Sequence, residues 1–218
     1  MVPMKCSVVA ISGSPVKNGN TQAFVMHMLK EASRRGAETE AVYLADHTIR
    51  ECIHCNFCLS SQTPGRYCSI RDDAQAIFEK VEKADIIVLA SPVYFMRTSA
   101  SMACLVDRLR VFMYGNITGG ALKNKIGVSA AVSWLRNAGL ETTHVNHILA
   151  FMTLEMIPAS THTSISPLGA SAVSSREGTG VFDPEIRLGV ENDQAGLDSA
   201  AAVMERAIEL AGLIKGRS

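Results

Sequence analysis

Residues 7–21 read SVVAISGSPVKNGNT, and this stretch decides how the rest of the chain is organised. Its first part, residues 8–11, is a short apolar run rich in β-branched side chains, as expected of a buried parallel strand. Gly13-Ser14-Pro15 cannot continue a strand, and a helical pattern begins at about Gln22. This order predicts a phosphate site, because free backbone N–H groups and the positive end of the helix dipole point at one spot.

The polar side chains of this loop suit a single phosphate group. The loop lacks the GxxxxGK[ST] pattern of nucleoside triphosphate sites and the GxGxxG pattern of dinucleotide sites. It therefore predicts a monophosphate ligand, which in this architecture indicates flavin mononucleotide (FMN). An ordinary turn between strand and helix stays open as the alternative, because small polar residues also fill such turns. The candidate phosphate-binding residues are Ser12, Ser14, Asn18, Asn20 and Thr21, with Lys17 as a positive charge.

Composition limits the class of protein. The chain has 218 residues, 47% of them hydrophobic and 19% charged, which predicts a single soluble domain over residues 1–218. Lys+Arg and Asp+Glu number 21 each, so there is no basic excess for nucleic acid or for a membrane surface. The first apolar run, residues 6–11, is too short for a signal peptide, and no run approaches a membrane span. We expect a cytoplasmic protein with no nucleic-acid or membrane partner.

Strand and helix patterns alternate along the chain. Five strands separated by helices predict an α/β fold: a flavodoxin-like, doubly wound parallel sheet with helices on both faces. The strands are expected at residues 8–11, 37–44, 86–90, 125–132 and 156–163, and the helices at residues 21–35, 99–114 and 141–154 and after Asp72 and Asp193.

Three smaller features carry their own expectations. Asp72 and Asp73 are expected to cap the helix that follows them. His144 and His147 are three residues apart on a helix, and we expect ordinary surface histidines rather than a metal site. Residues 164–192 lose all periodicity, and a loop of this length is usually functional or held by a partner.

Three loops are predicted to meet at the carboxyl edge of the sheet, where ligands bind in such folds. They are residues 12–21, 91–95 and 133–139. The second and third loops offer aromatic side chains to pack beside a flavin ring, and a glycine lets the backbone approach it. The residues expected there are Pro92, Val93, Tyr94, Phe95, Ser133, Trp134 and Gly139. Since the cofactor carries the difficult chemistry, no catalytic side chain is nominated.

Four of the six cysteines lie in one inserted loop, residues 50–71, which has neither helical nor strand periodicity. In a reducing compartment this favours metal or redox chemistry over disulfides. Cys52, Cys55 and Cys58 resemble the first three positions of a ferredoxin ligand run, and Cys68, returned by a turn at Pro64-Gly65, completes a four-thiolate set.

Two alternatives to a cluster remain. Zinc is one, although structural zinc sites more often use two separated CxxC pairs. Unmetallated thiols are the other, although no helix pattern starts at Cys52 to activate a CxxC redox pair. Because residues 50–71 carry few apolar side chains, we expect the loop to depend on its metal for order.

The motifs resemble a known family. Residues 13–21 (GSPVKNGNT), residues 91–95 (SPVYF) and the Asp107-Arg108 pair resemble the NAD(P)H-dependent FMN reductase superfamily. With the four cysteines and Asp72-Asp73, the chain resembles the iron–sulfur flavoprotein branch. The resemblance implies a homo-oligomer, dimer or tetramer, that binds FMN and a [4Fe–4S] cluster, with the phosphate on the residues named above and the ring beside residues 92–95.

The chain departs from this branch in two places. Nine residues separate Cys58 from Cys68, which is longer than the spacing typical of the branch. Residues 138–141 are Ala-Gly-Leu-Glu, where relatives often have Gly-Gly-Gln-Glu beside the flavin ring. The first departure concerns Cys68 as the fourth cluster ligand. The second concerns how the flavin ring, and any nicotinamide stacked on it, is held.

The predicted function is that of an FMN-dependent oxidoreductase whose cluster relays single electrons, with a redox partner such as NAD(P)H or ferredoxin. One alternative is an NAD(P)H-dependent FMN or quinone reductase whose cysteine loop is only structural. The other is a non-catalytic electron carrier of the flavodoxin type.

Overall fold

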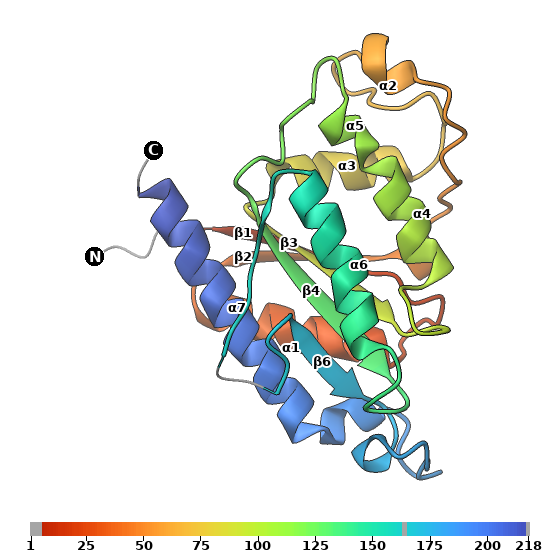
Figure 1. Cartoon of the computed structure of the whole chain (residues 1–218), viewed down its shortest axis with the longest axis vertical. Helices are drawn as coiled ribbons and strands as arrows, with labels where there is room; N and C mark the ends of the chain where they lie inside the picture. Colours follow the sequence, from red (N-terminus) through yellow and green to blue (C-terminus); the bar gives the residue numbers. More distant parts are fainter. Residues whose placement is uncertain (1–5, 163–164, 217–218) are drawn as a thin grey trace.

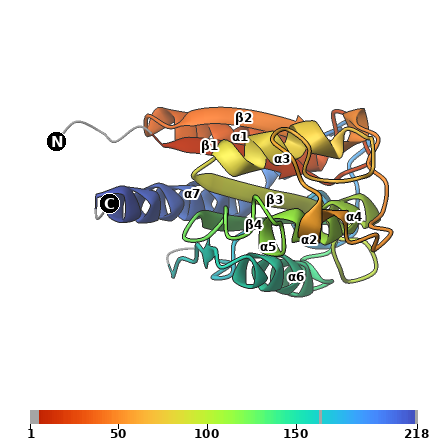
Figure 2. The same cartoon turned by 90° about the horizontal axis from the view of Figure 1, so that it is seen from above.

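The computed structural model describes residues 6–162 and 165–216. Its centre is a sheet of six parallel strands in the order β2-β1-β3-β4-β5, with β6 also paired to β4. Figure 2 shows β2, β1, β3 and β4 following one another across the molecule. The strands are β1 (Ser7–Ser12), β2 (Glu38–Tyr43), β3 (Ile86–Pro92), β4 (Ile126–Ser133), β5 (Ile157–Pro158) and β6 (Ala170–Val173). The predicted fold class is therefore confirmed.

The central strands are buried on both sides. Every residue of β3 and β4 is buried. This burial on both faces explains why the two strands have no alternating apolar and polar pattern. Register pairs Ala10 of β1 with Val88 of β3, and Val88 in turn with Val128 of β4.

Helices cover both faces of the sheet, and Figure 1 shows this arrangement. One apolar core forms between the sheet and α1 and α7, and a second between the sheet and α3 to α6. Successive residues of β1 alternate between the two cores: Val8 and Ala10 belong to the first, Val9 and Ile11 to the second. The helices are α1 (Asn20–Arg34), α2 (Phe57–Ser60), α3 (Ala74–Lys83), α4 (Ala100–Arg108), α5 (Arg110–Met113), α6 (Leu140–Thr153) and α7 (Gln194–Lys215).

The fifth position of the sheet differs from the prediction. Of the expected strand at residues 156–163, the last residue lies outside the described ranges, and within residues 156–162 only Ile157–Pro158 forms a strand, which pairs with the beginning of β4. The end of β4 pairs instead with β6, which lies in the segment where no strand was predicted. That expectation was wrong because β6 reads Ala-Ser-Ala-Val: its small residues give little hydrophobic signal, yet they allow close packing of α7. A Cβ atom added to Gly196 of α7 would lie 2.8 Å from the Cβ atom of Ala172.

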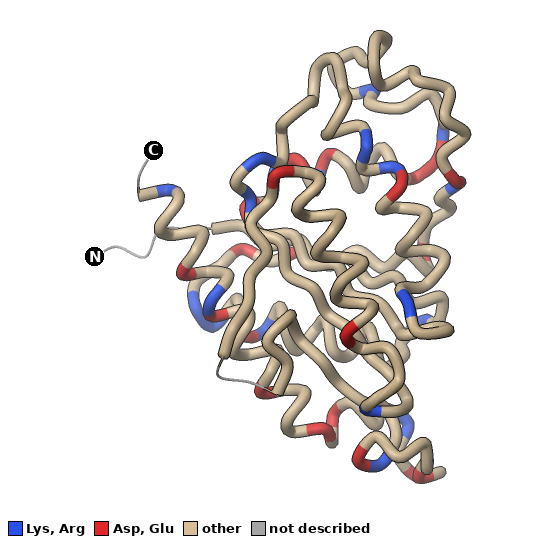
Figure 3. The backbone as a smooth tube through the Cα atoms, viewed as in Figure 1, with Lys and Arg blue, Asp and Glu red and all other residues tan. Residues whose placement is uncertain are grey.

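The predicted helix over residues 99–114 also differs, since it divides into α4 and α5 at Leu109. Residues 50–71 form a loop with the short helix α2, which lies beside α5 at the top of Figure 1. In Figure 3 basic and acidic positions are interspersed along the tube. Within the described ranges, no helix combines the length and the apolar character needed to cross a bilayer.

Candidate functional site

The three predicted loops do lie side by side at the carboxyl ends of β1, β3 and β4. The backbone N–H of Gly13 donates to the carbonyl of Ala90 over 2.7 Å, and the N–H of Val93 donates to the carbonyl of Val132 over 2.8 Å. The Ser99 hydroxyl, at the start of α4, donates to the carbonyl of Gly13 over 2.6 Å. These bonds tie the first loop to the end of β3 and to the start of α4, and the second loop to the end of β4.

The first loop has the form of an anion site. α1 begins at Asn20, and its N-cap residue is Gly19, which carries no side chain to occupy the free N–H groups of the first turn. The loop bonds to itself instead: the N–H of Val16 donates to Ser14 Oγ over 3.2 Å, and the N–H of Asn18 donates to Gln22 Oε1 over 2.5 Å. An anion at the end of α1 would therefore meet unpaired donors.

Two of the predicted phosphate residues have other contacts. Asn20 Oδ1 accepts a hydrogen bond of 3.0 Å from the N–H of Val190, which leaves its Nδ2 group as the donor for an anion. Lys17 forms an ion pair of 2.7 Å with Asp46 and is 63% exposed. Ser12, Ser14 and Thr21 are buried along the loop.

A second cation next to this loop was missed from sequence. Arg187 Nη2 donates to the carbonyl of Asn18 over 3.0 Å, so its guanidinium lies against the loop. It comes from a segment without periodicity, about 170 positions along the chain from its contact, and no local sequence pattern marks it.

The second loop makes a tight turn after Pro92, the last residue of β3, as predicted. Tyr94 and Arg97 exchange backbone hydrogen bonds of 3.0 and 3.2 Å. Between them Phe95 and Met96 both have left-handed backbone, with φ of 48° and 63°. Side chains other than glycine avoid this region, and such strain concentrates at functional sites. The turn presents Phe95 to solvent with 99% of its surface exposed, next to the half-exposed Tyr94.

The third loop supports this turn through Gly139. Gly139 has φ of +99°, and a Cβ atom there would lie 2.5 Å from the Cα atom of Met96 and 2.9 Å from Val93 Cγ1. Thr142, in the first turn of α6, donates its hydroxyl to the carbonyl of Met96. Glycine is therefore required at position 139 for the close approach, whichever residues flank it.

Trp134, predicted to pack beside the flavin ring, makes an edge-to-face contact with Phe182 at a centroid distance of 5.4 Å. It is 68% exposed. Ser133 ends β4, and its hydroxyl accepts a hydrogen bond of 3.3 Å from the N–H of Leu135. The third loop thus contacts both the second loop and the segment around Phe182.

The expectation that His144 and His147 are surface residues was wrong. They are 1% and 0% exposed, and both face Ser129 of β4. Ser129 Oγ lies 2.7 Å from His144 Nδ1 and 2.9 Å from His147 Nδ1. The Nε2 atoms meet Ser171 Oγ at 2.8 Å and Thr98 Oγ1 at 3.1 Å. Every ring nitrogen of the two histidines is thus paired with a hydroxyl.

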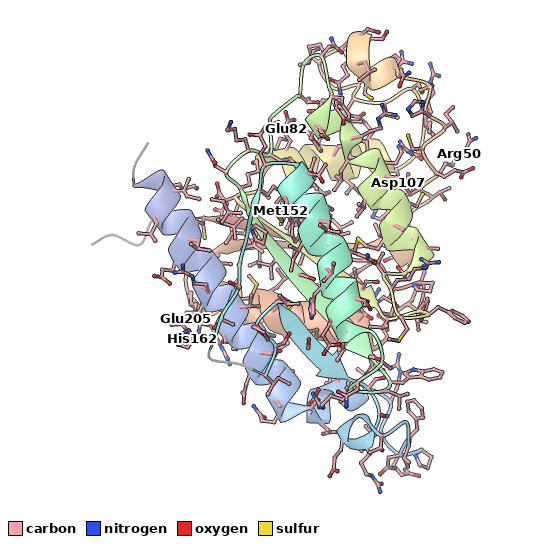
Figure 4. The ribbon with its side chains drawn as sticks, in the orientation of Figure 1. Arg50, Glu82, Asp107, Met152, His162 and Glu205 are labelled. Atoms are coloured by element: carbon pink, nitrogen blue, oxygen red, sulfur yellow. The ribbon has the colours of Figure 1, made fainter. Side chains whose placement is uncertain are left out.

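Burial lowers the pKa of His144 to about 4 and that of His147 to about 3, where the charge on His144 also contributes. Both side chains are therefore neutral near pH 7. The interpretation failed because the inner face of α6 is polar while its outer face carries the exposed apolar side chains of Val145, Leu149 and Met152. Figure 4 labels Met152 on α6.

The four predicted cysteines line one small cavity of about 20 Å³, together with Ile53, Asn56, Ile70, Arg108, Arg110 and Val111. All four are free thiols. Among the described residues no three Cys, His, Asp or Glu side chains are placed to hold a metal ion directly. Four thiols around a common space are, however, the donor set of an iron–sulfur cluster, in which each iron takes one thiolate.

The cysteines differ in their surroundings. Cys55 is exposed, and its thiol lies 3.0 Å from Ser69 Oγ; this hydrogen bond and the N–H of Phe57 lower its pKa. Burial raises the pKa of Cys58, which lies in α2. Left-handed backbone at His54 and Asn56, with φ of 51° and 59°, wraps the chain around Cys55. Cys6 and Cys104 lie outside this group: Cys6 is buried just before β1, and Cys104 is partly buried in α4.

The predicted turn at Pro64-Gly65 is present. Thr63 and Arg66 exchange backbone hydrogen bonds of 3.2 and 2.8 Å, and Gly65 has φ of +74°. The turn takes up the additional residues between Cys58 and Cys68, so the long spacing still returns Cys68 to the cavity.

The loop also has polar contacts that do not involve metal. Gln62 is 4% exposed, and its Nε2 group donates to the carbonyls of Tyr67 and Val111 over 3.1 and 3.3 Å. Its Oε1 atom accepts from the N–H groups of Ile117 and Thr118 over 3.0 and 3.2 Å. A single buried amide thus joins the loop to α5 and the segment after it.

Asp72 and Asp73 were both expected to cap α3, but only the Asp72 side chain bonds to the first turn of the helix. Asp72 Oδ1 accepts from the N–H of Ala74 over 3.2 Å, as a cap does, but the carboxylate is also ion-paired with Arg108 at 2.9 Å. Asp73 Oδ2 accepts from the N–H of Thr48 over 2.7 Å. Both carboxylates therefore fix the start of the cysteine loop.

A cavity of about 740 Å³ lies beside β6 and the first turns of α6, where Arg136 and Asp193 form an ion pair of 2.9 Å. It includes Arg136 and Asn137 of the third loop but no residue of the first two. It is thus separate from the predicted phosphate site.

Comparison with known proteins agrees with this geometry. Residues 6–169 match the NADPH-dependent FMN reductase family. An iron–sulfur flavoprotein of Methanocaldococcus jannaschii is 35% identical over 208 residues, which cover 95% of this chain and 98% of the relative. An iron–sulfur flavoprotein of Archaeoglobus fulgidus is 30% identical, with coverage of 95% and 96%.

Solved structures show the same fold. RosB superposes with a TM-score of 0.73 at 17% identity, over 97% of this chain and 81% of that one. A WrbA-like flavodoxin from Agrobacterium tumefaciens superposes with a TM-score of 0.59 at 13% identity, over 95% and 98%. The sheet order and these superpositions thus define a flavodoxin-like fold. The chain belongs to the NADPH-dependent FMN reductase family, and within it to the iron–sulfur flavoprotein branch, which confirms the resemblance drawn from its motifs.

Proposed function

We propose that this protein is an FMN-dependent oxidoreductase that passes electrons between FMN and a [4Fe–4S] cluster bound by Cys52, Cys55, Cys58 and Cys68. The observation that carries the proposal is the meeting of these four thiols, from both sides of a turn, on one cavity. The naming of close relatives as iron–sulfur flavoproteins supports it.

The first loop is proposed to hold the FMN phosphate. The free N–H groups of the first turn of α1, the hydroxyls of Ser14 and Thr21 and the Nδ2 group of Asn20 are the donors, and Arg187 supplies positive charge. Ser12 and Asn18 shape the loop: Ser12 Oγ accepts from the N–H of Ser14 over 3.4 Å, and Asn18 takes the left-handed backbone that turns it.

The second and third loops are proposed to hold the flavin ring. The turn at Tyr94–Arg97 and its support, Gly139, place an aromatic side chain and backbone groups at the carboxyl edge of the sheet. When bound, FMN supplies the hydride and electron transfer chemistry. The described residues orient the ring and exclude water, and none of them is required as an acid or base.

The two proposed sites are connected by α4. Ser99, at its beginning, bonds to Gly13 of the phosphate loop, and Arg108, at its end, lines the cysteine cavity. At a rise of 1.5 Å per residue the two ends are roughly 13 Å apart. Each site is therefore positioned by the same helix.

We also propose a homo-oligomer, dimer or tetramer, and a diffusing redox partner such as NAD(P)H or ferredoxin. The exposed apolar stripe of Val145, Leu149 and Met152 on α6 supports self-association, because exposed apolar patches of this kind mark interaction surfaces. The redox partner is proposed from the family alone.

Anaerobic purification followed by determination of iron, acid-labile sulfide and flavin tests the function. We expect FMN with four irons and four sulfides per protomer, as a [4Fe–4S] cluster contains. Cys68→Ala should remove the cluster and leave FMN bound. FMN without iron would favour a simple FMN or quinone reductase, and zinc in place of iron would reject the electron relay. Negligible NAD(P)H oxidation without a partner reductase would favour a carrier of the flavodoxin type.

A further inference from the structure

Arg108 is a buried cation beside the cysteine cavity. Its side chain is 1% exposed, and Asp72, its ion-pair partner, is 2% exposed. Nη1 donates to the carbonyl of Arg50 over 2.7 Å and to Asp72 Oδ2 over 2.9 Å, while Nη2 donates to Asp72 Oδ1 over 3.2 Å. Figure 4 labels Arg50 beside the end of α4 that carries this group. The guanidinium is therefore held rigidly at two of its three nitrogens.

The third nitrogen is left without a partner. Arg108 Nε is buried, and no described group accepts its hydrogen. A buried N–H of this kind is rare, because it has lost its hydrogen bond to water without forming one within the protein. The residue lines the cavity of the four cysteines, so a group placed in that cavity is within the reach of this donor.

Cys68 is the cysteine that Arg108 faces. Burial opposes the charge on Arg108, but its hydrogen bond with Asp72 and its interactions with the Cys68 thiol raise its pKa overall. Cys68 and Arg108 both line the cysteine cavity, and Cys68 lines a second cavity together with Asp72, the ion-pair partner of Arg108.

We propose that Arg108 is a positioning residue for the fourth cluster ligand: its Nε–H donates to the Cys68 thiolate once the cluster is bound. This inference rests on the proposed function. Arg108 lies outside the cysteine motif. Its hydrogen bond holds Cys68, the ligand that follows an unusually long spacing, in the position of the fourth cluster ligand.

Two effects follow from such a bond. Hydrogen bonds to cluster sulfurs withdraw electron density, which favours the reduced, more negative cluster and raises its reduction potential. Outer partners of metal ligands also hold the ligand in place, and their loss typically weakens metal binding by roughly 10–100-fold. Asp72 balances the charge of Arg108. The shift in the reduction potential of the cluster is therefore expected to come from the hydrogen bond rather than from the net charge of the pair.

The test compares two substitutions in protein loaded anaerobically with its cluster. Arg108→Lys keeps the charge but loses the Nε–H and the planar fork. Arg110→Lys is the matched control, because Arg110 lines the same cavity but bonds to Asn56 on the surface. We expect Arg108→Lys to shift the cluster potential to more negative values and to speed cluster release to a chelator roughly tenfold, with FMN content unchanged. Arg110→Lys should differ little from the wild type.

A further variant covers the case in which Arg108→Lys does not fold. Asp72→Asn with Arg108→Gln removes both charges together, so that no carboxylate is buried alone. It should lose cluster faster than the wild type. A third measurement needs no variant: the reduced cluster of wild-type protein labelled with ¹⁵N-arginine should show a ¹⁵N coupling by pulsed electron paramagnetic resonance, and Arg110→Lys protein should retain it.

The possible failures are distinguishable. Wild-type protein that contains no iron and sulfide contradicts the proposed function. A loaded cluster that shows no ¹⁵N coupling, or whose potential and release rate are the same in Arg108→Lys as in the wild type, contradicts the role of Arg108 alone.

Discussion

The hydroxyl of Ser99 donates to the carbonyl oxygen of Gly13 over 2.6 Å, and this bond joins the start of α4 to the loop after β1. Ser99 Oγ also accepts from the N–H of Met102 over 3.2 Å, so that one hydroxyl both caps the helix and holds the loop. Arg108 at the other end of α4 lines the cysteine cavity. The placement of the phosphate loop and of the cysteine loop therefore depends on a single helix.

Gly13→Ala should weaken FMN binding by at least about tenfold, because a Cβ atom there would lie 2.6 Å from Met102 Cβ and would push the loop away from α4. Fluorescence titration with FMN measures the effect. Gly212→Ala, in α7 with open space around it, is the control and should leave the affinity unchanged. Equal affinities in the two variants would contradict the proposed phosphate site.

Arg187→Gln should weaken FMN binding more than Lys17→Gln. Arg187 lies against the phosphate loop, whereas Lys17 is paired with Asp46. Hydrogen bonds to charged groups contribute about 1.5–3 kcal/mol, so a loss of about tenfold or more is expected for Arg187 and little for Lys17. Raising the salt concentration should reduce the difference. A larger effect of Lys17 would reverse the assignment of the cation.

Stability should fall as the pH is lowered from about 6.5 to about 4. The folded pKa values of His144 and His147, about 4 and about 3, lie below the value of about 6.5 expected in the unfolded chain. The unfolded state therefore binds more protons in this window, and each histidine costs up to about 1.4 kcal/mol per pH unit. Urea unfolding at several pH values measures the slope.

The control for this pH effect is His162→Gln, because His162 is exposed and is labelled near α7 in Figure 4. His147→Asn should flatten the pH dependence below 6.5, and His162→Gln should leave it as it is. An unchanged slope in His147→Asn would show that the buried histidine is not responsible.

Gln62→Ala should release the cysteine loop even without metal, since it leaves the buried carbonyl of Tyr67 and the buried N–H of Thr118 without their Gln62 partner. Each such group costs about 1–3 kcal/mol. Limited proteolysis of metal-free protein should cut within residues 50–71 in the variant and spare the wild type. Equal cleavage in both proteins would mean that the loop depends on the metal after all.

Leu149→Lys with Met152→Lys should lower the oligomeric state measured by light scattering with FMN bound, because both side chains belong to the apolar stripe on α6. Leu213→Lys, at an exposed apolar position of α7, is the control. A wild-type protein that is monomeric at micromolar concentration would contradict the proposed assembly.

The sequence by itself was sufficient for the fold class and for the four strands β1 to β4. A short, continuous apolar run such as residues 86–90 predicts a strand buried on both faces. In a parallel sheet, the loops that follow β1, β3 and β4 must then meet at one edge. The sequence also predicted that the four cysteines form one group, because their spacing is local along the chain, and the structure places all four on one cavity.

Only the tertiary structure decided the contacts between distant segments. β6 escaped prediction because its small residues are selected by the approach of α7, and the buried histidines of α6 appeared exposed because Ser129, on another element, is their partner. In the same way Arg187 reaches Asn18, and Arg108 reaches Asp72 and the cysteine cavity. From sequence alone, a polar side chain is predicted to lie on the surface, because the buried group that forms a hydrogen bond with it is not known. Packing between distant elements brings the two groups together, and local periodicity does not reveal it.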